Sequence, residues 1–281
     1  MNDAAAHRAR KRFGQHFLID VETIERIVRS INPQFEDNLV EIGPGKGAMT
    51  ALLTRRCRHL HVIEIDRDLV ALLQRQLARR RATAADMAAP GITIHQADAL
   101  TVDFSSFAGV KLVRVVGNLP YNISTPLIFH LLNFHHHIQD MYFMLQNEMV
   151  ERLVAQPGDR HYGRLSVMVQ YHCRADKLFE VPPSCFSPRP KVNSAIVRLK
   201  PHASPPAIAD DLGHFSQLVN CAFQQRRKTL RNALKSFLGA IADTVDAVPL
   251  PIDTRLRAEN LSVGDYVMLS NFLVAHANGS R

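Results

Sequence analysis

A short segment at residues 116–121 carries side chains suited to binding an amino group on a flat ring. It reads Val-Gly-Asn118-Leu119-Pro120-Tyr121 and follows an apolar run at 112–116 that is typical of a buried strand. Asn118 and the neighbouring backbone carbonyls offer hydrogen-bond acceptors, and Tyr121 offers an aromatic face on which a base can stack. Asn and Pro are also ordinary turn residues, so this segment alone fits a plain turn equally well.

A glycine-rich loop, Gly43-Pro-Gly45-Lys46-Gly47, follows an earlier apolar strand and precedes a helical pattern. Glycines let a backbone pass close to a ligand without side-chain collision. The spacing is G-x-G-x-G, which differs from the dinucleotide fingerprint G-x-G-x-x-G, and Lys46 is not part of a Walker A motif. The loop therefore favours a nucleoside cofactor over a dinucleotide or a nucleoside triphosphate.

Two acids follow the next two predicted strands. Glu64 ends the second strand, about where an acid binds the hydroxyl pair of a ribose, and Asp98 follows the third, where it can accept a hydrogen bond from an adenine. A lone Asp in a loop is usually just solvated. Because Gly43, Glu64, Asp98 and Asn118 fall at four successive strand ends, we expect them to line one pocket.

The elements that position these residues alternate between strands and helices. Asp20 is expected to cap the first helix, and Ser124 a later one. This alternation predicts an α/β, Rossmann-like fold whose mostly parallel, seven-stranded sheet carries helices on both faces. The expected strands are 39–42, 60–65, 92–96, 112–116, 141–145 and a closing antiparallel pair, 178–181 and 195–199; the expected helices are 21–31, 48–57, 68–80, 124–132 and two that begin near 147 and 164.

A Pro-rich stretch at 201–206 is typical of a linker, so we expect a catalytic domain at 1–200 and a small all-helical domain at 207–281. A Ser-x-x-Asp cap opens a helix at residue 262. The C-terminal domain holds a basic segment without acids, which either binds RNA phosphates or is a solvated helix face. Its cations are Arg226, Arg227, Lys228, Arg231 and Lys235, of which Arg227, Arg231 and Lys235 are spaced to align on one helix face.

Composition favours a cytoplasmic protein that binds a polyanion. The net charge is +8 and the pI about 9.6, with further basic clusters at 7–12 and 79–81. No apolar run approaches the roughly 18 residues of a membrane span, and the basic N-terminus lacks the apolar core of a secretory signal. The four scattered cysteines predict reduced thiols, and three adjacent histidines at 135–137 point in different directions, so neither group predicts a metal site.

Taken together, these motifs resemble the ribosomal RNA adenine N6-dimethyltransferase family, in its small-subunit (16S) branch. The resemblance spans about 200 residues in order, and its Asn-Leu-Pro-Tyr and Phe-Ser-Pro-x-Pro-x-Val segments are more specific than its glycine loop. The matching segments are Lys11-Arg-Phe-Gly-Gln-His-Phe-Leu18, Val40-Glu-Ile-Gly-Pro-Gly-Lys-Gly47, Val62-Ile-Glu-Ile-Asp66, the tetrapeptide at 118–121, Gln146-Asn-Glu-Met149 and Phe186-Ser-Pro-Arg-Pro-Lys-Val-Asn-Ser194.

The resemblance implies a class I methyltransferase that uses S-adenosylmethionine. It implies as partner the 16S rRNA of the small (30S) subunit or its precursor, in which two adjacent adenines of the 3′-terminal hairpin loop each receive two methyl groups. This chain has His16 where the family more often has Asn. The implied cofactor-binding residues are His16, Leu18, Gly43, Gly45, Glu64, Asp98 and Asn118.

For the reaction we expect Asn118 and the carbonyl of Leu119 or Pro120 to accept the N6 hydrogens of the target adenine. Tyr121 would stack on the base, with Phe186 as a candidate for its opposite face. No general base is demanded, because the proton can leave to water. The target must be a loop or flipped adenine, and we expect the enzyme to act as a monomer with a role in subunit biogenesis.

Three other functions remain open from the sequence. The related 23S rRNA adenine methyltransferases share the glycine loop but more often carry Asn-Ile-Pro-Tyr. A non-catalytic RNA-binding assembly factor with this fold is a second alternative, disfavoured by the intact acids and Asn118. A nicotinamide dehydrogenase is a third, disfavoured by the glycine spacing.

Overall fold

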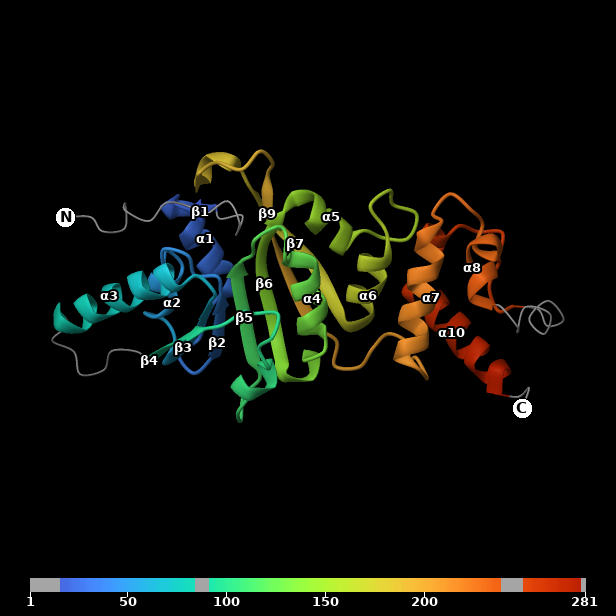
Figure 1. The fold of residues 1–281 in the computed structure, drawn as a ribbon, viewed down its shortest axis with the longest axis horizontal. Coiled ribbons are helices and arrows are strands. Elements are labelled where there is room, and N and C mark those ends of the chain that lie inside the picture. The colour runs from blue at the N-terminus through green and yellow to red at the C-terminus, as the bar shows by residue number, and fades with distance from the viewer. Residues whose placement is uncertain (1–15, 84–90, 239–249, 279–281) are drawn as a thin grey trace. The chain divides into compact units, whose positions relative to one another are not determined.

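The computed structural model describes residues 16–83, 91–238 and 250–278, and the chain divides into two compact units (Figure 1). The first unit comprises Met1–Val150 and Asp176–Pro201, and the second comprises Glu151–Ala175 and His202–Arg281. The division expected from the sequence, 1–200 and 207–281, therefore differs at residues 151–175. These residues group with the C-terminal helices because the backbone and side chains of 171–172 hydrogen-bond to His202 and Ala209.

The first unit is built on a seven-stranded sheet with the order β4-β3-β2-β5-β6-β9-β7. Strands β4 to β6 run parallel in that order, and β9 pairs antiparallel with β6, so the expected mostly parallel sheet is confirmed. The expected last pair, β7 and β9, lies together at one edge. The strands are β2 (Asn38–Ile42), β3 (His59–Glu64), β4 (Gly91–Gln96), β5 (Val113–Asn118), β6 (Ile138–Gln146), β7 (Cys173–Val181) and β9 (Ser194–Pro201).

Helices lie along the chain between these strands, as their alternation predicts (Figure 1). In the first of them the Asp20 carboxylate caps the helix by accepting from the Thr23 N–H at 2.8 Å, and the helix ends at Asn32 in the left-handed region with φ 47°. Its buried face, which includes Ile24 and Val28, joins the core against the sheet. The helices are α1 (Val21–Ile31), α2 (Thr50–Leu53), α3 (Arg67–Thr83), α4 (Ser124–Leu132) and α5 (Asn147–Val154), with 3-10 turns at Phe104–Phe107, His135–His137 and Pro183–Cys185.

The second helix is much shorter than the sequence pattern indicates. A helix was expected over 48–57, whereas α2 covers Thr50–Leu53. After it, the N–H groups of Arg55 and Arg56 bond to carbonyls three residues back, so the chain tightens into turns before β3. The glycine loop at 43–47 is therefore followed by a helix of about one turn.

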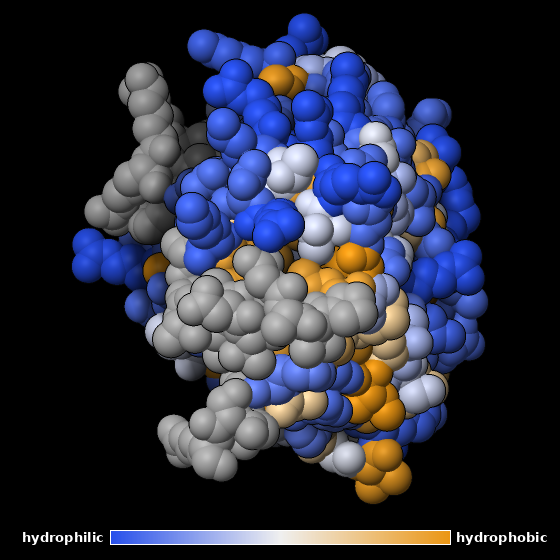
Figure 2. Space-filling model, turned by 90° about the vertical axis from the view of Figure 1, so that its right-hand side faces the viewer, coloured by the Kyte–Doolittle hydropathy of each residue, from blue (hydrophilic) through white to orange (hydrophobic). Residues whose placement is uncertain are grey.

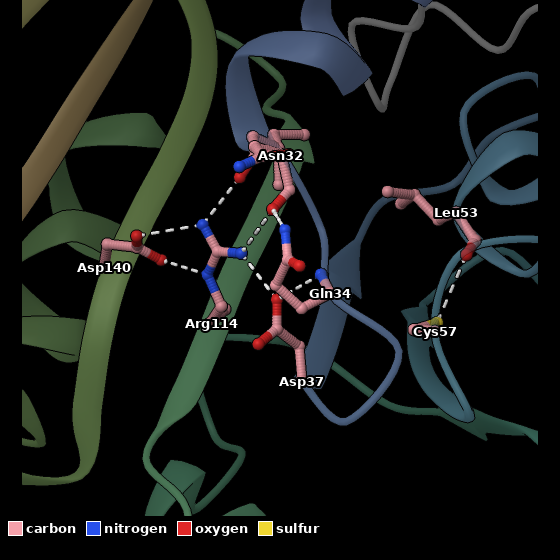
Figure 3. A network of polar contacts seen from close by, with 8 residues as sticks. Asn32, Gln34, Asp37, Leu53, Cys57, Arg114 and Asp140 are labelled. Carbon is pink, nitrogen blue, oxygen red and sulfur yellow. Dashed lines mark hydrogen bonds and ion pairs between the residues drawn. The ribbon is translucent and has the colours of Figure 1, made fainter.

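A buried ion network fixes the start of the sheet (Figure 3). The Arg114 guanidinium donates to both carboxylate oxygens of Asp140, at 2.8 and 3.0 Å, and to Asp37 at 2.6 Å. It also donates to the carbonyls of Ile31 and Asn32, at the end of α1. The network therefore joins β5, β6, α1 and the turn before β2 at the end of the strands opposite the glycine loop.

A second, two-stranded sheet places the N-terminal segment beside the main sheet. Strand β1 (Phe17–Leu18) pairs antiparallel with β8 (Phe186–Ser187), and Leu18 lies opposite Phe186. The Ile19 N–H also donates to the Cys185 carbonyl at 2.9 Å. The segment 185–188, far away in the sequence, thus holds residues 16–18 in place at the border of the site.

The second unit is helical in its described C-terminal residues, as expected. Helix α10 begins with the expected cap, since the Ser262 hydroxyl accepts from the Asp265 N–H at 3.1 Å while the Asp265 carboxylate accepts from the Ser262 N–H at 2.8 Å. Figure 2 shows hydrophilic groups over most of the surface in view, with smaller hydrophobic areas. The helices are α6 (Arg164–His172), α7 (Leu212–Gln224), α8 (Leu230–Leu238) and α10 (Val263–Asn278), with a 3-10 turn at Ala258–Asn260.

The basic segment does not form the continuous helix that its spacing suggests. Helix α8 begins at Leu230 and buries Leu230, Ala233 and Leu234, as expected. Residues 225–228 lie in the turn between α7 and α8. Arg227 is therefore not on one helix face with Arg231 and Lys235, because the helix needed for that alignment starts after it.

Candidate active site

The C-terminal ends of four parallel strands meet at one edge of the main sheet. Ile42 of β2 pairs with Ile63 of β3 and with Gly117 of β5, and Glu64 pairs with Gln96 at the end of β4. The residues that follow these ends line a single cavity of about 190 Å³, more than ten times the space that one water needs. Ten of the predicted site residues border it: His16, Leu18, Gly43, Gly45, Glu64, Asp98, Asn118, Leu119, Pro120 and Tyr121.

The glycine loop has a backbone that side chains would strain. Gly43, Gly45 and Gly47 have φ values of 65°, 58° and 81°, in the left-handed region. A Cβ added to Gly45 would lie 3.0 Å from the ring of Phe17, and one added to Gly47 would lie 2.8 Å from Leu73. Glycine is therefore required at these positions both by the backbone conformation of the loop and by the side chains that pack over it.

The two acids at the strand ends are held by backbone amides. Glu64 is buried and accepts from the Asp66 N–H at 2.9 Å. Burial raises the pKa of the Glu64 carboxyl, and the amides of Asp66 and Gly45 offset part of that rise. Asp98 accepts from the Leu100 N–H at 3.0 Å, which fixes its carboxylate in a turn beside the cavity.

A third carboxylate, which was not predicted from the sequence, also lines the cavity. Glu41 in β2 is 1% exposed, and neither of its carboxylate oxygens has a hydrogen-bond partner among the described residues. Burial raises the pKa of Glu41 to about 7, and the nearby Thr50 hydroxyl, which lies outside hydrogen-bonding geometry, offsets part of this rise. A buried anion without a donor is suited to a cationic group in the cavity.

The orientation of the Asn118 carboxamide follows from one hydrogen bond. Its Nδ2 donates to the His16 carbonyl at 3.0 Å. A backbone carbonyl can accept but not donate, so the amide nitrogen must face His16 and the Oδ1 must point the other way. Asn118 therefore presents an acceptor, and not a donor, beside the cavity that it lines.

The two backbone carbonyls proposed as the second acceptor differ in the hydrogen bonds that they already accept. The Pro120 carbonyl already accepts from the Ser124 hydroxyl at 2.8 Å and from the Ile123 N–H at 3.2 Å. A carbonyl oxygen has two lone pairs, so the expectation for Pro120 is wrong on this geometry. Among the described residues no group donates to the Leu119 carbonyl, which makes it the better acceptor.

Tyr121 is half-buried and anchored at its hydroxyl, which lies 3.0 Å from the hydroxyl of Ser194 in β9. Burial raises the pKa of the Tyr121 hydroxyl, and the Ser194 contact offsets part of this rise. The Tyr121 ring stacks against the ring of His16, with centroids 5.9 Å apart and planes inclined by 28°. An aromatic face therefore stands beside the acceptor atoms, as expected.

The structure does not bring Phe186 to the cavity. Its ring is 2% exposed and belongs to the hydrophobic core with Ile24, Tyr142 and Met144. The reason lies in β8, because Phe186 pairs with Leu18 and turns its side chain into the core. The expectation that Phe186 covers the second face of a bound base is therefore wrong in this structure.

Two further residues contribute to the site without having been selected from the sequence. A Cβ at Gly117 would lie 2.6 Å from the Ile42 carbonyl, so glycine is needed where β5 passes the end of β2. Phe17 packs on Leu69 and Leu72 of α3 and lies 5.0 Å from the Lys46 ammonium. The position of Gly117 directly before Asn118 was a signal for its role, whereas nothing in the sequence indicated the role of Phe17.

The predicted RNA-binding cations differ in their surroundings. Arg226 donates to the carbonyls of Arg160 and Tyr162 and to the Glu259 carboxylate, at 3.0 to 3.1 Å. Arg227, Lys228, Arg231 and Lys235 are exposed. Arg226 thus holds parts of the second unit together, which the sequence analysis did not anticipate. The basic cluster at 7–12 lies outside the described residues.

No group of three or more His, Cys, Asp or Glu side chains within the described ranges is arranged to hold a metal ion. The three histidines at 135–137 form a 3-10 turn. The same ranges contain no helix that is long and apolar enough to cross a membrane.

Comparison with known sequences identifies a family. Residues 6–275 match the family model described as ribosomal RNA adenine dimethylase. The chain is 55% identical over 266 residues to ribosomal RNA small subunit methyltransferase A of Alcanivorax borkumensis, covering 94% of this chain and 90% of that protein. It is 56% identical to the protein of the same name from Saccharophagus degradans, covering 95% of each chain.

Solved structures show the same fold. A dimethyladenosine transferase from Plasmodium falciparum superposes with a TM-score of 0.77 at 25% identity, covering 93% of this chain and 98% of the other. The 23S rRNA methyltransferase ErmE superposes with a TM-score of 0.68 at 24% identity, covering 92% and 99%. Both coverages extend across most of the chain, so the likeness includes residues of both units.

Proposed function

This chain belongs to the ribosomal RNA adenine dimethylase family, and from that premise we propose the reaction that it catalyses. It transfers methyl groups from S-adenosylmethionine to the N6 atoms of two adjacent adenines in the 3′-terminal hairpin loop of 16S rRNA, as part of small-subunit biogenesis. The observation that carries this proposal is the single cavity in which the Asn118 acceptor stands beside the glycine loop and its acids.

The residues that line the cavity fit S-adenosylmethionine in charge and in the close approach that the glycine loop allows. The cofactor is a cation at its sulfonium and its ammonium, and Glu41 supplies a buried carboxylate without a donor among the described residues. Gly43 and Gly45 border the cavity without a side chain, so a ligand can approach the backbone of the loop closely. In this arrangement Glu64 holds the ribose hydroxyls and Asp98 the adenine amine, while His16 and Leu18 border the cofactor.

The chain's own residues supply position and charge complementarity. The sulfonium methyl is already a strong electrophile, so no residue has to activate it. The target N6 is a weak nucleophile because its lone pair is delocalised into the purine ring. At the first transfer Asn118 Oδ1 and the Leu119 carbonyl accept its two hydrogens, which aims the nitrogen at the methyl group and offsets the positive charge that develops there. At the second transfer one hydrogen is left, and one of the two acceptors binds it.

The base itself is held by stacking, and its proton is lost to water. Tyr121 offers its ring to the purine, and the Ser194 contact anchors the hydroxyl end of that side chain. An adenine within a duplex does not reach the cavity, so the target is extruded or lies in a loop. We further propose that the enzyme acts as a monomer.

The small-subunit branch is favoured over the large-subunit one. Relatives at 55 and 56% identity bear the small-subunit name, whereas ErmE stands at 24%. The tetrapeptide at 118–121 also carries Leu119, and not the Ile that is commoner in the 23S branch. Exposed Arg227 and Lys228 are suited to phosphate contacts with the rRNA.

The test is methylation of isolated ribosomal subunits with labelled S-adenosylmethionine. Under-methylated small subunits should take up close to four methyl groups, and nucleotide mapping should place them on two adjacent adenines. Large subunits serve as the matched control and should stay unlabelled. Label on the large subunit alone, or no label with either subunit although the cofactor binds, would contradict the proposed function.

A further inference from the structure

The loop at 188–193, between β8 and β9, carries two exposed cations that the proposed reaction does not use. It reads Pro-Arg189-Pro-Lys191-Val-Asn and contains no acid. The cations stand at the two positions that the segment Phe-Ser-Pro-x-Pro-x-Val leaves open. The resemblance to the family therefore assigns them no role, and their function has to be inferred from their surroundings.

Both ends of this loop are tied to residues that line the cavity. At its start the Pro188 carbonyl lies 2.8 Å from Nδ1 of His16. Directly after its end the Ser194 hydroxyl lies 3.0 Å from the hydroxyl of Tyr121. His16 and Tyr121 line the cavity, whereas the loop itself does not. The loop therefore lies beside the cavity, on the side where β8 pairs with β1 (Figure 1).

Neighbouring cations of the first unit are paired with acids. Lys177 binds Glu180 and Arg198 binds Asp176, each at 2.8 Å. Within the ranges that the structure describes, neither cation of the loop has an ion pair. Their positive charges are therefore available to an anion from outside the chain.

Two prolines restrict the backbone that carries these charges. Pro188 and Pro190 fix their own φ, and a residue that precedes a proline is held in an extended conformation. Arg189 lies between the two prolines, and Pro190 is buried. The loop therefore loses little conformational freedom when a partner binds to it.

We propose that Arg189 and Lys191 bind backbone phosphates of the rRNA strand that carries the target adenine. When the base is extruded into the cavity, the phosphates of that strand stay outside it. Cations that contact phosphates fix the position of a strand without reading its sequence. This surface belongs to the first unit and is distinct from Arg227 and Lys228 of the second, and the inference rests on the proposed function.

The test neutralises the two cations and compares them with a matched pair. Arg189→Gln/Lys191→Gln removes two charges beside the cavity. The control, Arg55→Gln/Arg56→Gln, removes two exposed charges of the same unit from the turn before β3, at the opposite ends of the strands.

The assays use saturating S-adenosylmethionine and under-methylated small subunits. For Arg189→Gln/Lys191→Gln, kcat/KM should fall about tenfold, and the slope of log Kd against log salt should become shallower by about 0.7–0.9 for each lost phosphate contact. The control should stay within about twofold of wild type in kcat/KM and should keep the wild-type slope, since phosphate contacts act locally.

A charge-keeping exchange separates the charges from the shape of the loop. Arg189→Lys/Lys191→Arg retains both charges and should recover most of the lost kcat/KM. Calorimetry should give an unchanged affinity for S-adenosylmethionine in every variant, because the loop does not line the cavity. Thermal unfolding verifies that each variant is folded.

Three results would overturn the inference. An unchanged kcat/KM and salt slope in Arg189→Gln/Lys191→Gln would identify a solvated loop. Equal losses in the two Gln variants would assign the effect to net charge. A loss of S-adenosylmethionine affinity, or no recovery in the charge-keeping exchange, would show that the loop acts through His16 and Tyr121. The proposed function would stand in each case, because only a wild-type enzyme that leaves small subunits unlabelled counts against it.

Discussion

The Asn118 carboxamide has one atom for each of two tasks. Its nitrogen donates to the His16 carbonyl, and this leaves its oxygen free to accept from the amine of the adenine that we propose as the target. The sequence predicted Asn118 as an acceptor from residue type alone. It could not predict which way the amide points, because that depends on a carbonyl 102 residues away. The same holds for the carbonyls of Leu119 and Pro120, which differ only in that Ser124 and Ile123 donate to the second.

Glu41 yields a prediction with opposite effects on stability and binding. Its pKa is about 7 in the fold against an ordinary value of 4.5, so the folded chain binds more protons between these values. The stability contributed by protonated Glu41 is present below pH 4.5 and is lost as pH rises through 7, about 3 kcal/mol in all. Glu41→Gln should therefore raise Tm at pH 8 by several degrees and change it little at pH 5.

The same variant should bind S-adenosylmethionine at least tenfold more weakly at pH 8, because the buried carboxylate that faces a cation is gone. Calorimetry gives the affinity, and scanning calorimetry gives Tm. Thr54→Val, at a buried hydroxyl of the adjacent turn, is a control that should leave affinity unchanged. A lower Tm for Glu41→Gln at pH 8 would show that its carboxylate has a partner in the fold.

Tyr121 and Ser194 should act as a pair. Tyr121→Phe removes the hydroxyl and keeps the ring, so the rate of methyl transfer should fall by a few-fold. In Tyr121→Ala, which loses the ring, the rate should fall at least tenfold. Ser194→Ala should match Tyr121→Phe, and the double variant should lose no more than either alone. Additive losses in single-turnover assays would show that the two hydroxyls serve different tasks.

At the scale of elements, the strand ends were the most predictable part of the molecule. Apolar runs of four to six residues followed by Gly, Glu, Asp or Asn indicated each one, and parallel pairing brings such ends together. Helix α2 was less predictable, since its sequence pattern continued into turns. The β1–β8 pair was not predicted at all, because two-residue strands carry no periodicity, and with it the burial of Phe186 was missed.

The ion network at the other end of the sheet predicts a stability effect without a catalytic one. Arg114→Met leaves Asp37 and Asp140 buried without their cation, so the free energy of unfolding should fall by about 3–5 kcal/mol. Denaturant titration measures this, and adding Asp140→Asn should restore part of the loss. Because the network lies at the strand ends away from the cavity, kcat at a temperature where the variant is folded should stay near wild type.

At the scale of the whole molecule, the net charge is +8, and we expect particular cations to contact the rRNA. Exposed Arg227 and Lys228 are suited to this, whereas Arg226 is engaged with Glu259 and two carbonyls. In Arg227→Gln/Lys228→Gln the slope of log Kd against log salt for small subunits should become shallower by about 0.7–0.9 for each lost phosphate contact. An unchanged slope would identify the segment as a solvated surface.

Arg226→Gln is the matched variant for that experiment. It removes one charge from the same turn, but the Arg226 guanidinium bonds within the second unit. This variant should therefore lower Tm and leave the slope of log Kd against log salt nearly unchanged. The sequence could count these cations but not sort them. Nor could it place residues 151–175 with the C-terminal helices, since a helix pattern does not indicate which neighbour buries its apolar face.

The most direct test of the account is single-turnover methyl transfer by Asn118→Ala at saturating S-adenosylmethionine, with cofactor affinity measured in parallel. If the carboxamide oxygen aims the adenine N6 at the methyl group, the rate on small subunits should fall at least 100-fold, while the cofactor Kd changes by less than about threefold. A rate close to wild type would contradict the account, because the cavity would then transfer methyl groups without the acceptor that defines it.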